Sequence, residues 1–182
     1  MEILSVEHPD AIARAMSALD SGELVIVPGD LRYFVVADAL DDSAIERLFD
    51  ATQRPADRPL IALLSGYGDL HHVGYGGSGA RELAQTHWPG PTVLSVKARP
   101  WMPEGVTAGH DELRIMAPAQ PATNALARAF GPLAAGSARI QGQRDSLDAK
   151  SAAERLGASV ALVLDAGALP GGEEAYVVGP EG

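Results

Sequence analysis

The chain has 182 residues, of which 46% are hydrophobic and 21% charged, a balance typical of one soluble domain spanning residues 1–182. It contains no cysteine, which excludes a disulfide scaffold, a thiolate zinc site, an iron–sulfur cluster and a cysteine nucleophile. The net charge of −10 argues against a broadly basic surface for nucleic acid or anionic lipid, but leaves room for a local basic cleft.

Predicted strands and helices alternate along the chain. MEILSVEHPD at the start lacks a signal-peptide pattern, and no apolar run approaches the ~20 residues of a membrane span, so we expect a cytoplasmic protein. Hydrophobic periodicity and Pro or Gly stops predict, in chain order, a strand at 2–6, a helix at 8–20, strands at 24–27 and 33–37, a helix at 42–51, a strand at 60–64, a Gly-rich loop at 65–79, a helix at 80–86, strands at 92–97 and 113–116, a helix at 120–130, a strand at 133–136, a helix at 147–156, and strands at 159–165 and 175–178. Ser146 is the predicted N-cap of the last helix and Gly157 its stop. The alternation predicts an α/β domain with helices flanking a sheet.

Two features suggest familiar sites but lack the residues that those sites need. GYGGSG at 74–79 has no Lys-Ser/Thr pair of a phosphate-binding P-loop, so we interpret it as a flexible loop. The five histidines show no metal-ligand spacing, and we interpret His71 and His72 as exposed loop residues. We therefore assign no metal site.

Polar side chains gather in three segments that adjoin predicted buried strands. The segments are VPGDLRYFV (27–35), QRPADRPLIALL (53–64) and GSARIQG (136–142), with the polar residues Asp30, Arg32, Tyr33, Arg54, Arg58, Ser137 and Arg139. Ligands collect where loops leave strand ends, and arginine forks bind phosphate and carboxylate through parallel donors. We expect the four arginines to form one positive pocket on an acidic protein. The alternative is that each arginine is a solvated surface residue.

Six motifs then point to a family. They are GELVIVPGDLRYFV (22–35) for a strand and a PTDTVYGL-like turn, TQRPADRPLIAL (52–63) for KxRP…PL, HWPGPTVLSVKARPWMPEGVTAG (87–109) for WPGPLT with the strand and turn after it, ELRIMAPAQP (112–121) for VGVRxPxHP, GPLAAGSARIQG (131–142) for PL-x-x-x-SANxSG, and VLDAGALPGG (163–172) for a late Asp-x-Gly turn. With these motifs the chain resembles the YrdC family, best known for threonylcarbamoyl-AMP synthases, over nearly its whole length.

The resemblance implies a fold and a reaction. The fold is a twisted mixed sheet flanked by helices around a large concave cavity. The reaction joins threonine, bicarbonate and ATP, with Mg²⁺ on the phosphates, into threonylcarbamoyl-adenylate for a modification of adenosine in tRNA. The resemblance also implies double-stranded RNA or tRNA as partners. Because the net charge of −10 opposes long polyanions, we favour a small anionic ligand. No pattern indicates an oligomeric state.

The chain departs from the family at several signature positions. The Lys-x-Arg signature keeps its arginine as Arg54 but has Thr52 in place of the lysine, and Ser-x-Asn keeps Ser137 but has Arg139 in place of the asparagine. In the first motif Gly29 and Leu31 replace both threonines, and Phe34-Val35 replaces Gly-Leu. The arginine of VGVRxP aligns with Met116. Cations are thus lost at positions 52 and 116 and gained at positions 32 and 139.

Three interpretations of these departures stay open. Arg139 stands in for the lost lysine, the cavity serves another nucleotide or acyl-adenylate ligand, or the domain is silent. A silent domain would bind nucleotide or double-stranded RNA without turnover, or serve as a structural partner-binding module. Losing a phosphate-facing cation typically costs 10²–10³-fold or more in rate, which predicts altered or reduced synthase activity. The predicted catalytic residues are Arg54 and Ser137, and the predicted binding residues are Asp30, Arg32, Tyr33, Thr52, Arg58 and Arg139.

Overall fold

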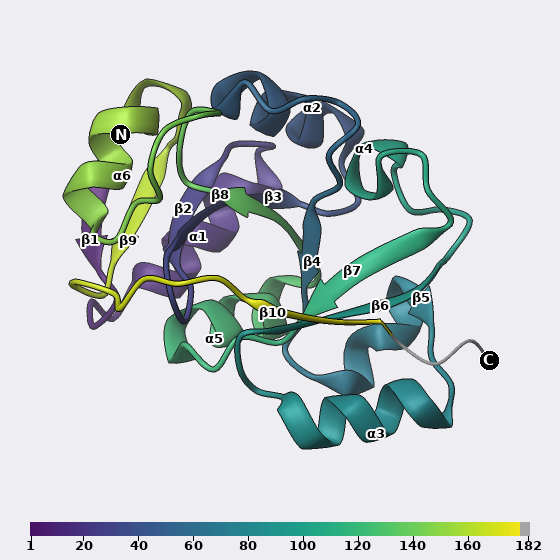
Figure 1. Ribbon diagram of the computed structural model, residues 1–182. Helices are drawn as coiled ribbons and strands as arrows, with labels where there is room; N and C mark the ends of the chain where they lie inside the picture. The colour runs from purple at the N-terminus through teal and green to yellow at the C-terminus, as the bar shows by residue number, and fades with distance from the viewer. Residues whose placement is uncertain (179–182) are drawn as a thin grey trace.

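The computed structural model describes residues 1–178, in which one mixed sheet runs through the molecule (Figure 1). The strands are β1 (Glu2–Ser5), β2 (Val25–Pro28), β3 (Tyr33–Asp38), β4 (Ile61–Leu63), β5 (Gly74–Tyr75), β6 (Thr92–Ala98), β7 (Glu112–Met116), β8 (Leu133–Ser137), β9 (Leu162–Asp165) and β10 (Ala175–Val178). The helices are α1 (Ala11–Asp20), α2 (Asp42–Thr52), α3 (Ser78–His87), α4 (Glu104–Thr107), α5 (Pro121–Phe130) and α6 (Ala149–Leu156), with 3₁₀ turns η1 (Tyr67–His72) and η2 (Gly157–Ser159).

The strand order is β1-β9-β2-β3-β8-β4-β7-β6-β10, with β5 paired to β6 off this path. The centre of the sheet is antiparallel where β3 pairs with β2 and β8, and parallel where β4 pairs with β7. The predicted α/β class with a mixed sheet is confirmed. Because β8 runs antiparallel to β4, the end of β8 and the start of β4 lie at the same edge of the sheet. This pairing brings the segments after β8 and before β4 together.

Each face of the sheet has its own hydrophobic core, because strand side chains alternate between the two faces. In β3, Tyr33 and Val35 join the core under α2, α3, α4 and α6, whereas Phe34 and Val36 join the core under α1 and α5. The second core ends near the edge where β8 meets β4. There the sheet face is left open to a cavity.

The structure corrects several predicted boundaries. α6 is capped by Asp148, whose carboxylate accepts from the backbone N–H of Ser151 at 2.8 Å, and not by Ser146. Ser146 is fully buried, and its hydroxyl donates to the carbonyl of Ala138 instead. The predicted loop 65–79 contains η1, β5 and the first residues of α3, and α4 was not predicted. α1 begins at Ala11 and β9 at Leu162, each three residues later than expected. Within residues 1–178, no helix is long and apolar enough to cross a membrane.

Candidate functional site

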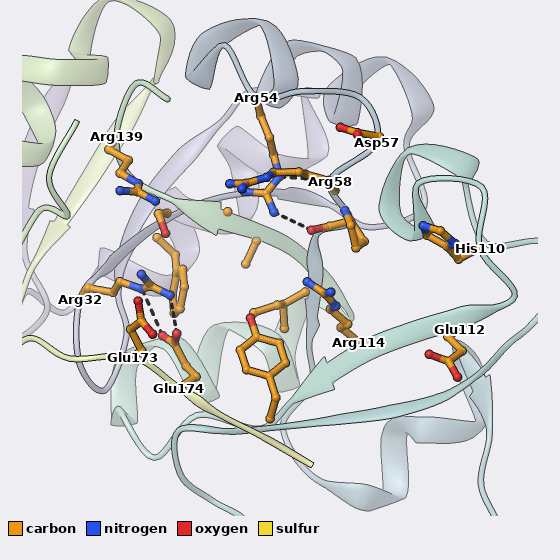
Figure 2. Close-up of a pocket in the computed structure, with 17 residues that line it drawn as sticks. Arg32, Arg54, Asp57, Arg58, His110, Glu112, Arg114, Arg139, Glu173 and Glu174 are labelled. Carbon is orange, nitrogen blue, oxygen red and sulfur yellow. Dashed lines mark hydrogen bonds and ion pairs between the residues drawn. The ribbon is translucent and has the colours of Figure 1, made fainter. Parts of the chain in front are cut away.

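A cavity of about 660 Å³ lies on the face of the sheet that carries the α1/α5 core (Figure 2). Its floor comes from β3, β8 and β4, through Phe34, Ala135 and Ile61. One wall is the segment that precedes β4, and another is the C-terminal segment just before and within β10, yellow in Figure 1. Loop segments from distant parts of the chain therefore meet over one patch of sheet.

Five of the eight residues predicted from the sequence line this cavity. They are Arg32, Arg54, Arg58, Ser137 and Arg139. The register explains the meeting, because β3 pairs with β8 so that Phe34 lies opposite Ser137, and Ile61 of β4 lies opposite Ala135 of β8. The expected convergence of the four arginines on one cavity is found.

The other three predicted residues lie outside the cavity lining and have contacts elsewhere. The carboxylate of Asp30 accepts from the backbone N–H groups of Ala119 (3.0 Å) and Gln120 (2.7 Å), at the start of α5. The Thr52 hydroxyl donates to the carbonyl of Leu48 at 2.8 Å, inside α2. These contacts stabilise turns and helix ends, and neither Asp30 nor Thr52 lines the cavity.

Tyr33 is the third of these residues, and its side chain is fully buried on the opposite face of the sheet from Phe34. Its hydroxyl donates to the carbonyl of Gly167 at 2.8 Å and accepts from the N–H of Ala166 at 3.0 Å. Burial raises the pKa of Tyr33 to about 12. The phenol therefore anchors the turn after β9. Tyr33 does not line the cavity, because successive strand residues point to opposite faces of the sheet and Phe34 is on the cavity face.

One side of the cavity is an ion-pair network, here called the paired side: Arg32, Arg139, Asp145 and Glu174. Arg32 bonds Asp145 at 2.9 Å and pairs with Glu174, whose side chain is only 2% exposed. Arg139 lies 3.4 Å from Asp145 and donates to the carbonyl of Gln143 at 2.6 Å. Burial opposes the Arg32 charge, but the two carboxylates outweigh it and raise the pKa of Arg32. The two arginines that this chain gained are thus neutralised by its own acids.

The other side, here called the open side, consists of Arg54, Arg58 and Arg114. Arg54 donates to the carbonyls of Arg58 (3.1 Å) and Pro59 (2.6 Å), which orders the segment before β4. None of the three forms an ion pair with a carboxylate of residues 1–178. Burial, and after it the charge of Arg58, lowers the pKa of Arg54. Like charges held together in this way favour binding of an anion.

Sequence reasoning missed several lining residues. They are Asp57, His110, Glu112, Arg114, Glu173, Glu174 and Tyr176. The one available signal was the period of two in β7, where Leu113 and Ile115 are fully buried and Arg114 must face the other way. The lining also contains four carboxylates, Asp57, Glu112, Glu173 and Glu174, beside its five arginines. Among the described residues, the lining arginines without an ion-pair partner are those of the open side.

Metal-binding side chains do not gather in the described part of the chain. Among residues 1–178, no group of three or more His, Asp or Glu side chains is placed to hold a metal ion. The arginines instead offer N–H donors, which bind phosphate or carboxylate oxygens. The residues present therefore fit an anionic organic ligand and do not form a protein cage for Mg²⁺.

Comparison with known proteins identifies the family. The Sua5_yciO_yrdC family model, described as telomere recombination, matches residues 17–181. A putative threonylcarbamoyl-AMP synthase of Mycobacterium tuberculosis (strain ATCC 25618 / H37Rv) is 36% identical over 157 residues, which cover 86% of this chain and 72% of that protein. The family resemblance seen in the sequence motifs is confirmed by this match.

Two solved structures share the fold. Pyrococcus abyssi Sua5 complexed with L-threonine superposes with a TM-score of 0.89 and 31% identity, over 93% of this chain and 51% of that chain. Escherichia coli YciO gives a TM-score of 0.87 at 20% identity, over 98% of this chain and 89% of that chain. This chain thus spans about half the length of the Sua5 chain. The protein belongs to the Sua5/YciO/YrdC family.

Proposed function

We propose that the cavity binds ATP, threonine and bicarbonate, and that the chain forms threonylcarbamoyl-adenylate with reduced or altered activity. The observation that carries this proposal is the open side, where Arg54, Arg58 and Arg114 face one cavity without carboxylate partners among residues 1–178. The relatives named threonylcarbamoyl-AMP synthase and the threonine complex of P. abyssi Sua5 support the substrate class.

In the proposed reaction, the threonine amine and bicarbonate condense to a carbamate with loss of water. A carbamate oxygen then bonds to the α-phosphorus of ATP as the bond to pyrophosphate breaks. Negative charge builds on the phosphoryl and leaving oxygens, and in this proposal Arg54 and Arg58 stabilise it with their N–H donors. The Ser137 hydroxyl, at the cavity end of β8, supplies a further hydrogen bond to the bound ligand.

Mg²⁺ would enter with the nucleotide, on its phosphate oxygens, as is usual for this ion. No step of the proposal depends on the metal.

The reduced activity follows from two positions. Thr52 is 5% exposed and bonded within α2, so it supplies no cation where the family has a lysine. Arg139 was the sequence-based candidate to replace that lysine, but it contacts Asp145 and the carbonyl of Gln143. One missing phosphate-facing donor typically lowers turnover by about 10²–10³-fold.

The test is pyrophosphate release from ATP at high enzyme concentration, with threonine and bicarbonate present and with each omitted in turn. We expect slow release that requires both, that is lost in Arg54→Met and that persists in Arg81→Met, an exposed arginine of α3. Release no greater than in the absence of enzyme would overturn the proposed synthesis.

A second candidate is a nucleotide-binding domain without turnover, and the neutral Thr52 favours it. Calorimetric titration with ATP and AMP, without any pyrophosphate release, would support this candidate. We expect duplex RNA or tRNA to bind weakly and to be released by modest salt, because the net charge of −10 repels polyanions outside the cavity. Either role would be carried out in the cytoplasm, where ATP and tRNA occur together.

A further inference from the structure

The family motif VGVRxP aligns its glycine with Arg114 and its arginine with Met116. In β7 these two positions lie on the same face of the sheet, because Leu113 and Ile115 belong to the core on the opposite face. Met116 is 1% exposed and fills the α1/α5 core. The chain therefore has its cation two residues earlier than the family motif does. The two positions lie on the same face of the sheet, about 7 Å apart along the strand.

The surroundings of Arg114 suit ligand binding. Its strand partner is Ile61, so the cavity floor beside it is apolar. Its guanidinium carbon lies 5.3 Å from the centre of the Tyr176 ring, a cation–π distance that orients the side chain. Figure 2 shows the guanidinium directed towards the side of the cavity that carries Arg54 and Arg58.

The electrostatics point the same way. Arg114 has no carboxylate within 4 Å in the described part of the chain, in contrast to Arg32 and Arg139. After burial and the charge of Arg58, the charge of Arg114 is a further cause that lowers the pKa of Arg54. An anion held between these guanidinium groups would relieve the repulsion between them.

We propose that Arg114 replaces the cation that the family motif carries at position 116, and that its guanidinium binds a phosphate group of the nucleotide. This assignment rests on the proposed function of the cavity. It is separate from the expectation that Arg139 stands in for the lysine lost at position 52, and Arg139 itself is held by Asp145. Arg114 is then a ligand-binding residue that the family motif does not contain.

The experiment is calorimetric titration of the full chain with ATP, and separately with inorganic pyrophosphate. We compare the wild type with Arg114→Met and with the control Arg81→Met. Arg114→Met should raise the dissociation constant for ATP about 10- to 100-fold, because it removes charge-assisted hydrogen bonds. Arg81→Met should stay within twofold of the wild type, because Arg81 is exposed on α3 and lies outside the cavity lining.

The outcomes separate this inference from the proposed function. If ATP and pyrophosphate bind and Arg114→Met stays within twofold of the wild type, the Arg114 assignment is overturned and the proposed function stands. If ATP does not bind but pyrophosphate does, and Arg114→Met abolishes that binding, the proposed function fails while the anion-binding role of Arg114 is upheld. Binding of neither probe overturns both.

A folding control accompanies the titrations. Circular dichroism must show wild-type secondary structure for Arg114→Met. If Arg114→Met does not fold, Arg114→Lys is the second variant. Lysine keeps the positive charge but cannot form the bidentate hydrogen bonds of a guanidinium group. We expect Arg114→Lys to lose about 3- to 10-fold in affinity for ATP, since one of two parallel hydrogen bonds is removed. If folded Arg114→Lys binds ATP as tightly as the wild type, bidentate phosphate binding by Arg114 is contradicted.

Discussion

On the paired side of the cavity, arginines contact carboxylates of the same chain, whereas on the open side they face the cavity without one. Both sides are built from the same residue type, and both lie within one cavity. The two sides differ in whether carboxylates of the chain lie within ion-pair distance of the arginines. Among residues 1–178, Asp145 pairs with Arg32 and Arg139, and Glu174 pairs with Arg32. Asp145 lies in the loop before α6 and Glu174 in the segment before β10.

This difference separates two uses of arginine. On the paired side the guanidinium groups connect distant segments of the chain, so they stabilise the fold and the shape of the cavity. On the open side they form no ion pair within residues 1–178, so their charge is available to a ligand. Substitutions on the two sides should therefore change different measured quantities.

The largest expected effect is on the paired side. Arg32→Met leaves Glu174, 2% exposed, as a buried carboxylate without its cation, and such losses cost about 3–5 kcal/mol of stability. Urea unfolding measures this change in the free energy of unfolding. Adding Glu174→Gln to the variant should recover part of the loss, because the orphaned charge is then gone. A loss below about 1 kcal/mol would show that the pair contributes little.

The next effect concerns Tyr33, which follows Arg32 and ties the paired side to the turn after β9. With its pKa raised to about 12 from an ordinary value of 10, the folded state keeps the phenol proton where the unfolded chain loses it. The resulting stability is complete below pH 10 and falls by about 2–3 kcal/mol as pH rises to 12. Urea unfolding from pH 9 to 12 measures it.

Tyr33→Phe is the matched control for this pH dependence. The variant has no phenol to ionise, so its free energy of unfolding should fall less steeply between pH 10 and 12 than that of the wild type. It should also be about 1 kcal/mol less stable at pH 7, because the buried hydrogen bonds to the turn are lost. Parallel curves for the two proteins would assign the pH effect to other groups.

The smallest change in free energy is expected on the open side. Arg58 is exposed, so Arg58→Met should change the free energy of unfolding by no more than about 0.5 kcal/mol. The same substitution should weaken ATP binding about tenfold, because a charged donor to phosphate is removed. Calorimetric titration and urea unfolding of one sample measure both. A large stability loss with unchanged ATP affinity would erase the distinction between the two sides.

Much of the site follows from the sequence because it is encoded locally. Arg54 and Arg58 precede a strand with a clear apolar run, Ser137 ends another and Arg139 follows it, so both pairs were expected at strand ends. Thr52 was assigned to the same group on motif position alone, and Asp30 on its place after a predicted strand as well as on its motif. Their side chains form hydrogen bonds with backbone groups instead, Asp30 at the start of α5 and Thr52 within α2. A motif alignment does not show whether such a side chain binds a ligand or the backbone.

Arg114 was missed for a different reason. Its strand was predicted correctly, and the period of two already places residue 114 opposite the buried Leu113 and Ile115. Which of the two faces bears the cavity depends on where α1 and α5 end over the sheet. That is a property of tertiary packing, which the pattern of one strand does not contain.

The sequence by itself determined the alternation of strands and helices, the family, and the placement of arginines at strand ends, because each depends on residues near one another in the chain. Only the tertiary structure decided which arginines keep their charge for a ligand. Arg32 meets a carboxylate 142 residues away, and that meeting exists only because the chain before β10 passes over the cavity on its way to pair with β6. Neutralisation of a charge depends on distance in space, to which distance along the chain is a poor guide.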